Sequence, residues 1–223
     1  MMKKLSLGLL LAGFSLLAAA QGPVKFSLRA GLNFPTYTHS AEPGIAVSDI
    51  GRNISAYAGV TADIPAGGLI SVQPGIIFSG KGYKDKASFN HDGTKGSAMV
   101  KDDIIYAEIP LNLIANLPAG KNTVCLGAGP YVGIALYGRT KYKNSVYGSQ
   151  QQPAESGDYE VDFGSDGVYR RIDAGLNLTV GMRFPSGVGI QAGYDLGLSP
   201  INRDDDLIKY KHSVISLGMT IGI

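Results

Sequence analysis

The chain of 223 residues carries 20 basic and 18 acidic side chains, 31 glycines, one cysteine and no tryptophan. A charge balance this even lacks the basic excess of nucleic-acid-binding proteins, and a single cysteine excludes an internal disulfide. The length suits one large all-β domain or two small ones.

The first twenty residues have the pattern of a secretory signal peptide. Lys3 and Lys4 precede an apolar run, and three alanines end that run directly before Gln21, as signal peptidase requires. We therefore predict a signal peptide over residues 1–20 and an exported mature chain over residues 21–223. The mature chain contains no apolar stretch long enough for a membrane helix.

A two-residue alternation of apolar and polar side chains begins soon after and predicts strands. Its longest run, residues 103–118, exceeds a usual soluble strand and is long enough to cross a bilayer when tilted. One side of this run would face lipid, and the other, with Tyr106 and Glu108, a barrel interior. The same period predicts eight strands, over residues 24–34, 53–64, 69–83, 103–118, 123–137, 171–184, 188–198 and 215–223.

The connections between these strands alternate in length. Short turns at 64–68, 118–122 and 185–187 alternate with long polar segments at 35–52, 84–102, 138–170 and 199–211. Bacterial membrane barrels have an even strand number, tight periplasmic turns and long outer loops, whereas a soluble sandwich would turn polar side chains outward. The predicted fold is all-β: an eight-stranded antiparallel up-and-down transmembrane β-barrel, whose closure pairs every backbone group in hydrocarbon.

Charged residues of both signs are assigned to the interior: Lys25, Arg29, Asp63, Lys81, Glu108, Arg171, Asp173, Arg183 and Asp195. Opposite charges there should pair, since an unpaired buried ion is costly. They form either a structural plug, because an eight-stranded interior is only wide enough for its own side chains, or the lining of a narrow pore with Glu108 and Arg29 as central pair. Inward glycines such as Gly31 and Gly175 would make room for tyrosines.

Catalysis on lipid would need a histidine beside a serine nucleophile, and the three histidines do not provide this arrangement. His39 and His212 each precede a serine, but sequence neighbours on a strand point to opposite faces. His91 lies in Asn-His-Asp-Gly, a turn sequence. We expect all three to be solvated loop residues, and we predict no catalytic, cofactor-binding or metal-binding residues.

The segment 138–170 is rich in acids. Around Asp158 their spacing superficially suggests a calcium loop, but the required glycine and glutamate are missing. Alternation of aromatic residues with the acids predicts instead that the strand hairpin continues above the membrane. There Arg139, Lys141 and Lys143 would face the acids across the hairpin, provided that a bulge, for which 164–167 is a candidate, corrects the parity.

Several tyrosines stand near the predicted outer ends of the strands. They are Tyr83, Tyr106, Tyr137, Tyr142, Tyr169, Tyr194 and Tyr210. We expect those among them that face lipid to form an interfacial girdle; the alternative is that some line the barrel mouth and stack on a ligand.

Tyr106-Ala-Glu-Ile-Pro-Leu-Asn-Leu113, followed by Gly127-Ala-Gly-Pro-Tyr-Val-Gly133 and Asp173-Ala-Gly-Leu-Asn-Leu178, resembles the PorT-like outer-membrane β-barrel family. The similarity in order and spacing covers essentially the whole mature chain, and the first segment is the most specific. The resemblance implies a small barrel of the OmpA or OmpX type. Most members have no assigned activity, and one branch is associated with a protein secretion system.

These observations together predict a non-enzymatic structural or interaction protein of the cell outer membrane. We expect it to contact outer-membrane lipid and, through its long loops, envelope or secretion proteins, and not nucleic acid. A narrow porin-like channel for small solutes is the alternative. A lipid-modifying enzyme is a third candidate, which the histidine arrangement disfavours.

Overall fold

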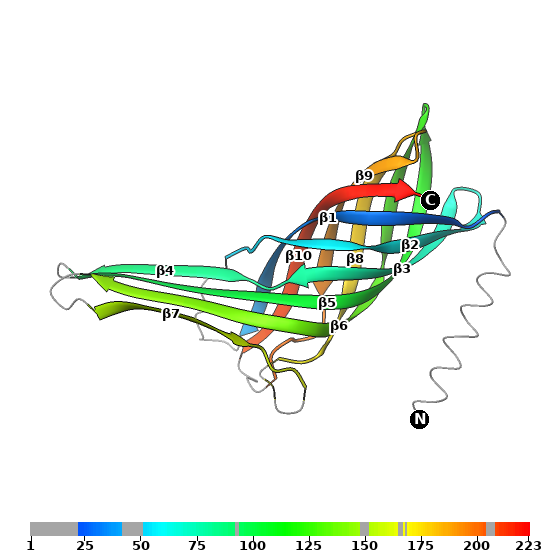
Figure 1. Ribbon diagram of the computed structural model, residues 1–223. Coiled ribbons are helices and arrows are strands. Elements are labelled where there is room, and N and C mark those ends of the chain that lie inside the picture. Colours follow the sequence, from blue (N-terminus) through cyan, green and yellow to red (C-terminus); the bar gives the residue numbers. More distant parts are fainter. Residues whose placement is uncertain are drawn as a thin grey trace, which may run out of the picture.

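The computed structural model describes residues 22–41, 51–91, 94–147, 152–164, 167, 169–203 and 208–223, and these form strands and connecting segments (Figure 1). No helix among them is long and apolar enough to cross a membrane. The strands are β1 Lys25–Ala41, β2 Ser55–Gly67, β3 Ile70–Lys81, β4 Lys84–His91, β5 Thr94–Ala119, β6 Asn122–Tyr147, β7 Gln152–Glu160, β8 Ile172–Arg183, β9 Val188–Gly197 and β10 Ile208–Gly222.

Eight of these strands close into a ring, in the order β1, β2, β3, β5, β6, β8, β9, β10 and back to β1. Every pairing in the ring is antiparallel, and β1 pairs on both sides, with Arg29 opposite Gly59 in β2 and Thr220 in β10. Closure leaves the ring without an edge, so backbone N–H and C=O groups can pair between neighbouring strands all the way round. The predicted eight-stranded up-and-down barrel is confirmed.

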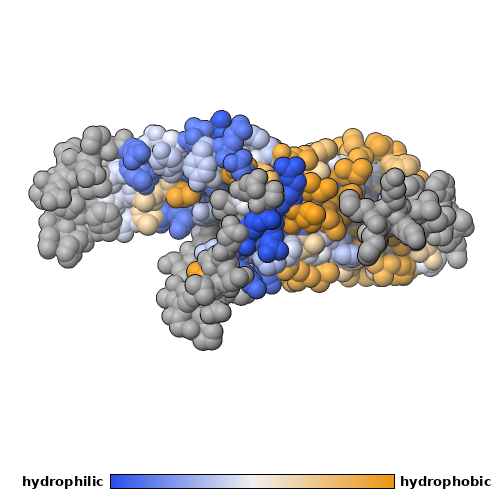
Figure 2. Space-filling model, turned by 90° about the horizontal axis from the view of Figure 1, so that it is seen from below, coloured by the Kyte–Doolittle hydropathy of each residue, from blue (hydrophilic) through white to orange (hydrophobic). Residues whose placement is uncertain are grey.

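The outer wall of the ring is apolar. Most of the side chains that the alternation places toward lipid are exposed, and Ile109 in β5 is 60% exposed, whereas Ile64 near the end of β2 is buried. In the view of Figure 2, hydrophobic residues form a broad band across the visible face of the barrel. A soluble protein rarely exposes an apolar patch of this extent, and hydrocarbon is the solvent that this wall fits. Short turns connect neighbouring strands at one end of the barrel. One of them contains Gly120, whose φ of 64° favours glycine.

Two of the predicted long loops are largely strands. β5 and β6, each 26 residues long, run well beyond the barrel, and β4 and β7 pair with their extensions. The result is a four-stranded sheet in the order β4, β5, β6, β7 that projects from the long-loop end (Figure 1). We call it the projecting sheet: residues 84–91, 94–103, 139–147 and 152–160.

The expected continuation of the hairpin beyond the barrel is confirmed by the pairing of β6 with β7. A bulge lies in β6, because its register with β5 shifts between Ile105 and Tyr106 at the position of Leu136, and residues 165 and 166 of the expected bulge lie outside the described residues. Beyond that shift the odd-numbered side chains of β6 point outward. Arg139 lies opposite Glu160 and Lys141 opposite Asp158 in β7, as expected, whereas Lys143 lies opposite Ser156. The extra residue in β6 moves the outward side from even-numbered to odd-numbered residues, which resolves the disagreement in parity noted in the sequence.

Candidate functional site: the barrel interior

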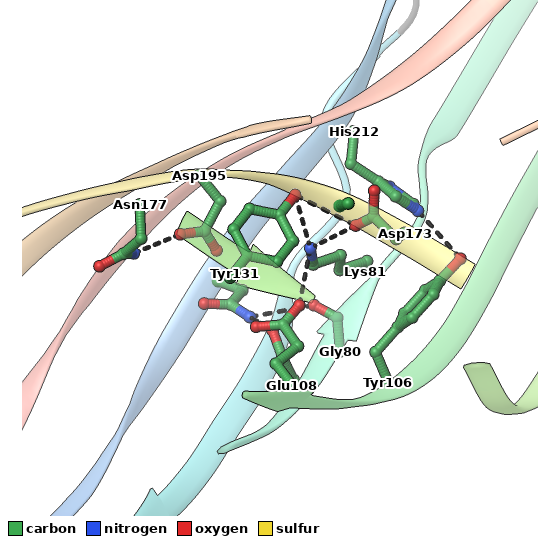
Figure 3. A network of polar contacts seen from close by, with 12 residues as sticks. Gly80, Lys81, Tyr106, Glu108, Tyr131, Asp173, Asn177, Asp195 and His212 are labelled. Carbon is green, nitrogen blue, oxygen red and sulfur yellow. Dashed lines mark hydrogen bonds and ion pairs between the residues drawn. The ribbon is translucent and has the colours of Figure 1, made fainter. Parts of the chain in front are cut away.

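An ion cluster centred on Lys81 lies inside the barrel (Figure 3). The Lys81 ammonium, fully buried, lies 2.6 Å from Glu108 Oε1 and 2.8 Å from Asp173 Oδ2. It also donates a hydrogen bond to Tyr131 Oη at 3.3 Å, and Tyr131 Oη donates to Asp173 at 3.1 Å. Four consecutive strands of the ring, β3, β5, β6 and β8, supply these side chains, so the cluster ties one side of the barrel wall together.

Glycines make the space in which these side chains lie, as the sequence predicted. A Cβ atom added to Gly175 would stand 2.8 Å from the Tyr131 ring, and one added to Gly31 would stand 2.8 Å from the Tyr57 ring. Real Cβ atoms do not approach that closely, so neither tyrosine could keep its position beside a larger residue. The inward glycines thus allow large polar aromatics inside a narrow barrel.

Arg29 forms a second layer nearer the short-turn end. Its guanidinium donates hydrogen bonds to Gln191 at 2.6 Å and to Gln73 at 3.4 Å, and Gln191 donates in turn to Tyr57 Oη at 2.8 Å. Two cavities of about 40 Å³ each lie on either side of this layer. The predicted ion pair between Arg29 and Glu108 is wrong, because Lys81 takes the glutamate while glutamines take the arginine.

The other predicted interior charges divide into two groups. Arg183 pairs with Asp63 at 2.9 Å near the short-turn end. Buried Asp195 accepts a hydrogen bond from Asn177, and both residues line the cavity that also contains Glu108 in its wall. Lys25 is exposed at the short-turn end, and Arg171 is exposed directly before β8. Lys25 lies opposite the inward Asp63, but Lys25 and Arg171 both stand at strand ends where solvent reaches their side chains, so the prediction that they lie in the barrel interior is wrong.

His212 is the interior residue that the sequence missed. It is fully buried in β10, with Nε2 at 3.1 Å from Tyr106 Oη and its ring packed edge-on against Tyr37 and Tyr106. The expectation of a solvated histidine is wrong here, because β10 begins at Ile208 and not at 215. His39 lies in β1 and is half-buried, and the side chain of His91 lies outside the described residues.

The barrel mouth at the long-loop end is covered. Phe163 and Tyr169, which we call the mouth cover, pack against the buried cluster of Ile104, Tyr106 and Ala135. Tyr106 and Tyr169 are therefore interior contacts and not members of a lipid-facing girdle. Tyr137 is 42% exposed on the outside, as a girdle requires.

Asp102 fastens the mouth cover from below. Its two carboxylate oxygens accept hydrogen bonds of 2.7 Å, one from Tyr169 Oη and one from Thr140 Oγ1. Burial raises the pKa of the Asp102 carboxyl above its ordinary value, and the nearby Asp103 carboxylate raises it further, while the two hydroxyl donors oppose this change. We call the contact of Asp102 with Tyr169 and Thr140 the latch. It lies beyond the apolar wall of the barrel, and protonation of the Asp102 carboxyl would alter it.

Among the described residues, the interior brings together charged side chains of both signs. Within the described residues no three histidine, cysteine, aspartate or glutamate side chains gather closely enough to hold a metal ion. The hydrogen-bond partner of His212 is a tyrosine and not a serine. What the geometry provides is a set of compensated ions that link strands of the barrel, with small cavities between the layers.

A closed ring with an apolar outer wall and a charged, compensated interior defines a small transmembrane β-barrel. The chain belongs to the family described as outer membrane protein beta-barrel domain, whose model matches residues 19–203. It is an outer-membrane β-barrel protein. No curated protein matches the chain.

Solved structures of similar fold include several outer-membrane proteins. OprG from Pseudomonas aeruginosa is 10% identical with a TM-score of 0.45, over 92% of this chain and 98% of that one. A major outer membrane protein from Thermus thermophilus is 11% identical with a TM-score of 0.42, over 91% and 100%. Ail, the attachment invasion locus protein of Yersinia pestis, is 14% identical with a TM-score of 0.34, over 90% and 97%.

Proposed function

We propose that this outer-membrane barrel is a non-enzymatic structural and interaction protein of the cell envelope. In this proposal residues 1–20 are a cleaved signal peptide, the short turns face the periplasm, and the projecting sheet stands outside the cell. The observation that carries it is the interior: the Lys81 cluster, the Arg29 layer and the mouth cover succeed one another along the barrel. A lumen filled in this way is an anchor and not a passage.

The projecting sheet supports an interaction role. β4 and β7 stand at its two ends, and each pairs with one strand within the described residues. Open strand edges bind extended segments of other proteins by adding a strand. The proposed partners are envelope or secretion proteins, in keeping with the resemblance to the PorT-like family.

The alternative function is a narrow pore for small solutes, which the two interior cavities favour. Each cavity of about 40 Å³ exceeds the space that one water needs, and both have linings that mix polar and apolar side chains. Only the Arg29 layer separates them. Truncating Arg29 should therefore join the cavities, while Glu108 and Asp195 would remain as a negatively charged lining.

Single-channel conductance in a planar bilayer tests the two functions. Refolded protein should first migrate differently when unboiled, which shows that the barrel is closed. We expect no unitary steps from the native protein and small steps from the Arg29→Ala variant, which also shows that the protein inserts. Reproducible steps from the native protein that change with Glu108→Gln would contradict the structural role and establish the pore.

A lipid-modifying activity has the least support. The His212 side chain is fully buried, and its Nε2 atom shares a hydrogen bond with Tyr106 Oη and not with a serine hydroxyl. The measurement is release of acyl chains from lipid vesicles by the purified protein. We expect none. Release that a His212→Ala variant abolishes would contradict the non-enzymatic role.

A further inference from the structure

One face of the projecting sheet continues the lipid-facing wall of the barrel. In β5 the side of the strand that exposes Ile105 carries Asp103 and then Lys101 further along. In β6, beyond the bulge, Tyr137 is followed on the same side by Arg139. Successive side chains on one face of a strand are two residues apart, so the apolar wall changes directly into a charged one. Figure 2 shows hydrophilic atoms bordering the hydrophobic band.

Lysines gather on this face. Lys84, Lys101 and Lys141 lie directly opposite one another on three adjacent strands, and Lys86 and Lys143 flank Met99 in the next row. We call these five lysines the basic face. Like charges directly opposite on neighbouring strands repel and destabilise a sheet. A bound anion would remove that cost.

Most of the basic face has no acidic partner in the protein. Lys101 pairs with Asp103 at 2.8 Å, and Arg139, beside the basic face, pairs with Asp158 at 3.1 Å. Within the part of the chain that the structure describes, the other four lysines have no carboxylate at ion-pair distance. On the same face of β7, Asp158 lies opposite Lys141 and Glu160 lies opposite Arg139. With Asp103 these acids make three negative charges against six positive ones, so the described residues of this face remain net positive.

The position of the basic face matches the headgroup layer of the membrane. Ile105, 45% exposed, is the last apolar residue on the lipid side of β5, and Lys101 follows four residues further along the strand. At about 3.3 Å per residue, and with the tilt of about 40° usual in such barrels, the lysine row stands roughly 10 Å above the hydrocarbon edge. Tyr137 marks that edge, as interfacial tyrosines do.

We propose that the basic face binds the phosphate groups of anionic lipid headgroups in the outer leaflet. An acidic protein would also be attracted by lysines, but the continuity of this face with the lipid-facing wall favours a ligand that has both phosphates and acyl chains. Each basic residue near an anionic membrane surface strengthens binding roughly fivefold at low salt. This inference rests on the proposed orientation, with the projecting sheet outside the cell.

The test measures binding of the folded full chain, held in zwitterionic detergent, to mixed micelles that contain bisphosphorylated lipid A. The variant is Lys141→Gln with Lys143→Gln, and the matched control is Lys25→Gln with Lys121→Gln, two exposed lysines at the short-turn end. We expect the first pair to weaken binding at least tenfold and the second less than threefold. Lys141→Arg with Lys143→Arg should retain binding, which separates charge from folding.

Three results would overturn the inference: equal losses in the two glutamine pairs, equal binding of dephosphorylated lipid A, or complete displacement by inorganic phosphate at millimolar concentration. The last result would assign the site to free phosphate. The conductance experiment is independent of this one. A conducting barrel that binds lipid A contradicts only the proposed function, and a silent barrel that does not bind it contradicts only this inference.

Discussion

Replacing Lys81 with methionine should be the most damaging single change in the barrel interior. Methionine keeps most of the volume of the lysine chain but removes the charge that compensates Glu108 and Asp173. Asp173 would keep hydrogen bonds from Tyr131 and Ser199, whereas Glu108 would lose its ionic partner. Removing one partner of a buried ion pair typically costs about 3–5 kcal/mol, so we expect the free energy of unfolding to fall by that amount.

A triple variant and two double-mutant cycles separate lost charge compensation from lost packing. Lys81→Met combined with Glu108→Gln and Asp173→Asn removes all three charges, and we expect it to recover most of the lost stability. A double-mutant cycle between Lys81 and Glu108 should give a coupling of about 1–3 kcal/mol. The same cycle between Arg29 and Glu108 should give less than about 0.5 kcal/mol, because the two side chains share no hydrogen-bond partner.

The assay is urea unfolding of the barrel in lipid vesicles, extrapolated linearly to zero urea. The chain has no tryptophan, so circular dichroism and the mobility of unboiled samples replace tryptophan fluorescence. The reasoning would be refuted if Lys81→Met cost less than about 1 kcal/mol, which is the scale of an ordinary uncharged hydrogen bond. It would also be refuted if the charge-free triple variant were no more stable than Lys81→Met.

Four smaller predictions concern the mouth cover, the interior glycines and the projecting sheet. Because burial raises the pKa of Asp102, the folded state takes up a proton before the unfolded state does. The mouth cover should therefore gain stability as the pH falls from that raised pKa towards the ordinary value near 4, and hydrogen exchange of its amides, corrected for intrinsic rates, should slow over this window; exchange that quickens would contradict the sign. Tyr169→Phe removes a hydrogen bond to the Asp102 carboxylate and should raise its pKa further, as carboxyl-carbon NMR titration would show; an unchanged pKa would contradict the latch. Gly175→Ala should cost at least about 1–3 kcal/mol by urea unfolding, and Gly222→Ala, whose added Cβ would have 3.6 Å of clearance, should be nearly neutral; similar costs for both would contradict the steric argument. Arg139→Ala removes an exposed ion pair and should change the free energy of unfolding by less than about 1 kcal/mol, and a larger loss would show that the pair supports the projecting sheet.

The eight barrel strands could be predicted because hydrocarbon imposes one rule on all of them. Each lipid-facing position must be apolar, and this requirement writes the two-residue period directly into the sequence. The projecting sheet is surrounded by water and is under no such requirement. Residues 94–103 contain glycine, serine, lysine and aspartate at positions that lipid would forbid, so the continuation of β5 has the composition of a loop.

The pairing of the interior charges could not be predicted for a different reason. Parity assigns a side chain to the inside but does not give its height along the barrel axis, which depends on the stagger between strands. In the structure Lys81 lies opposite Ile104, four residues along β5 from Glu108. The length of the two side chains brings the ions together, and no spacing in the sequence records that reach.

Near His212 the outward side chains of β10 change from apolar to basic, although the direction in which odd and even residues point stays the same. From Ile208 to Val214 the two-residue period of β10 persists, but Lys209 and Lys211 now point outward while His212 and Val214 are buried inside. A search for outward apolar residues therefore ends at Ile215, although the strand does not. The same change occurs in β5 between exposed Ile105 and the outward lysine row. In both strands the outward side chains change from apolar to basic at the proposed boundary between hydrocarbon and headgroups. The change therefore agrees with the proposal that these lysines bind headgroup phosphates.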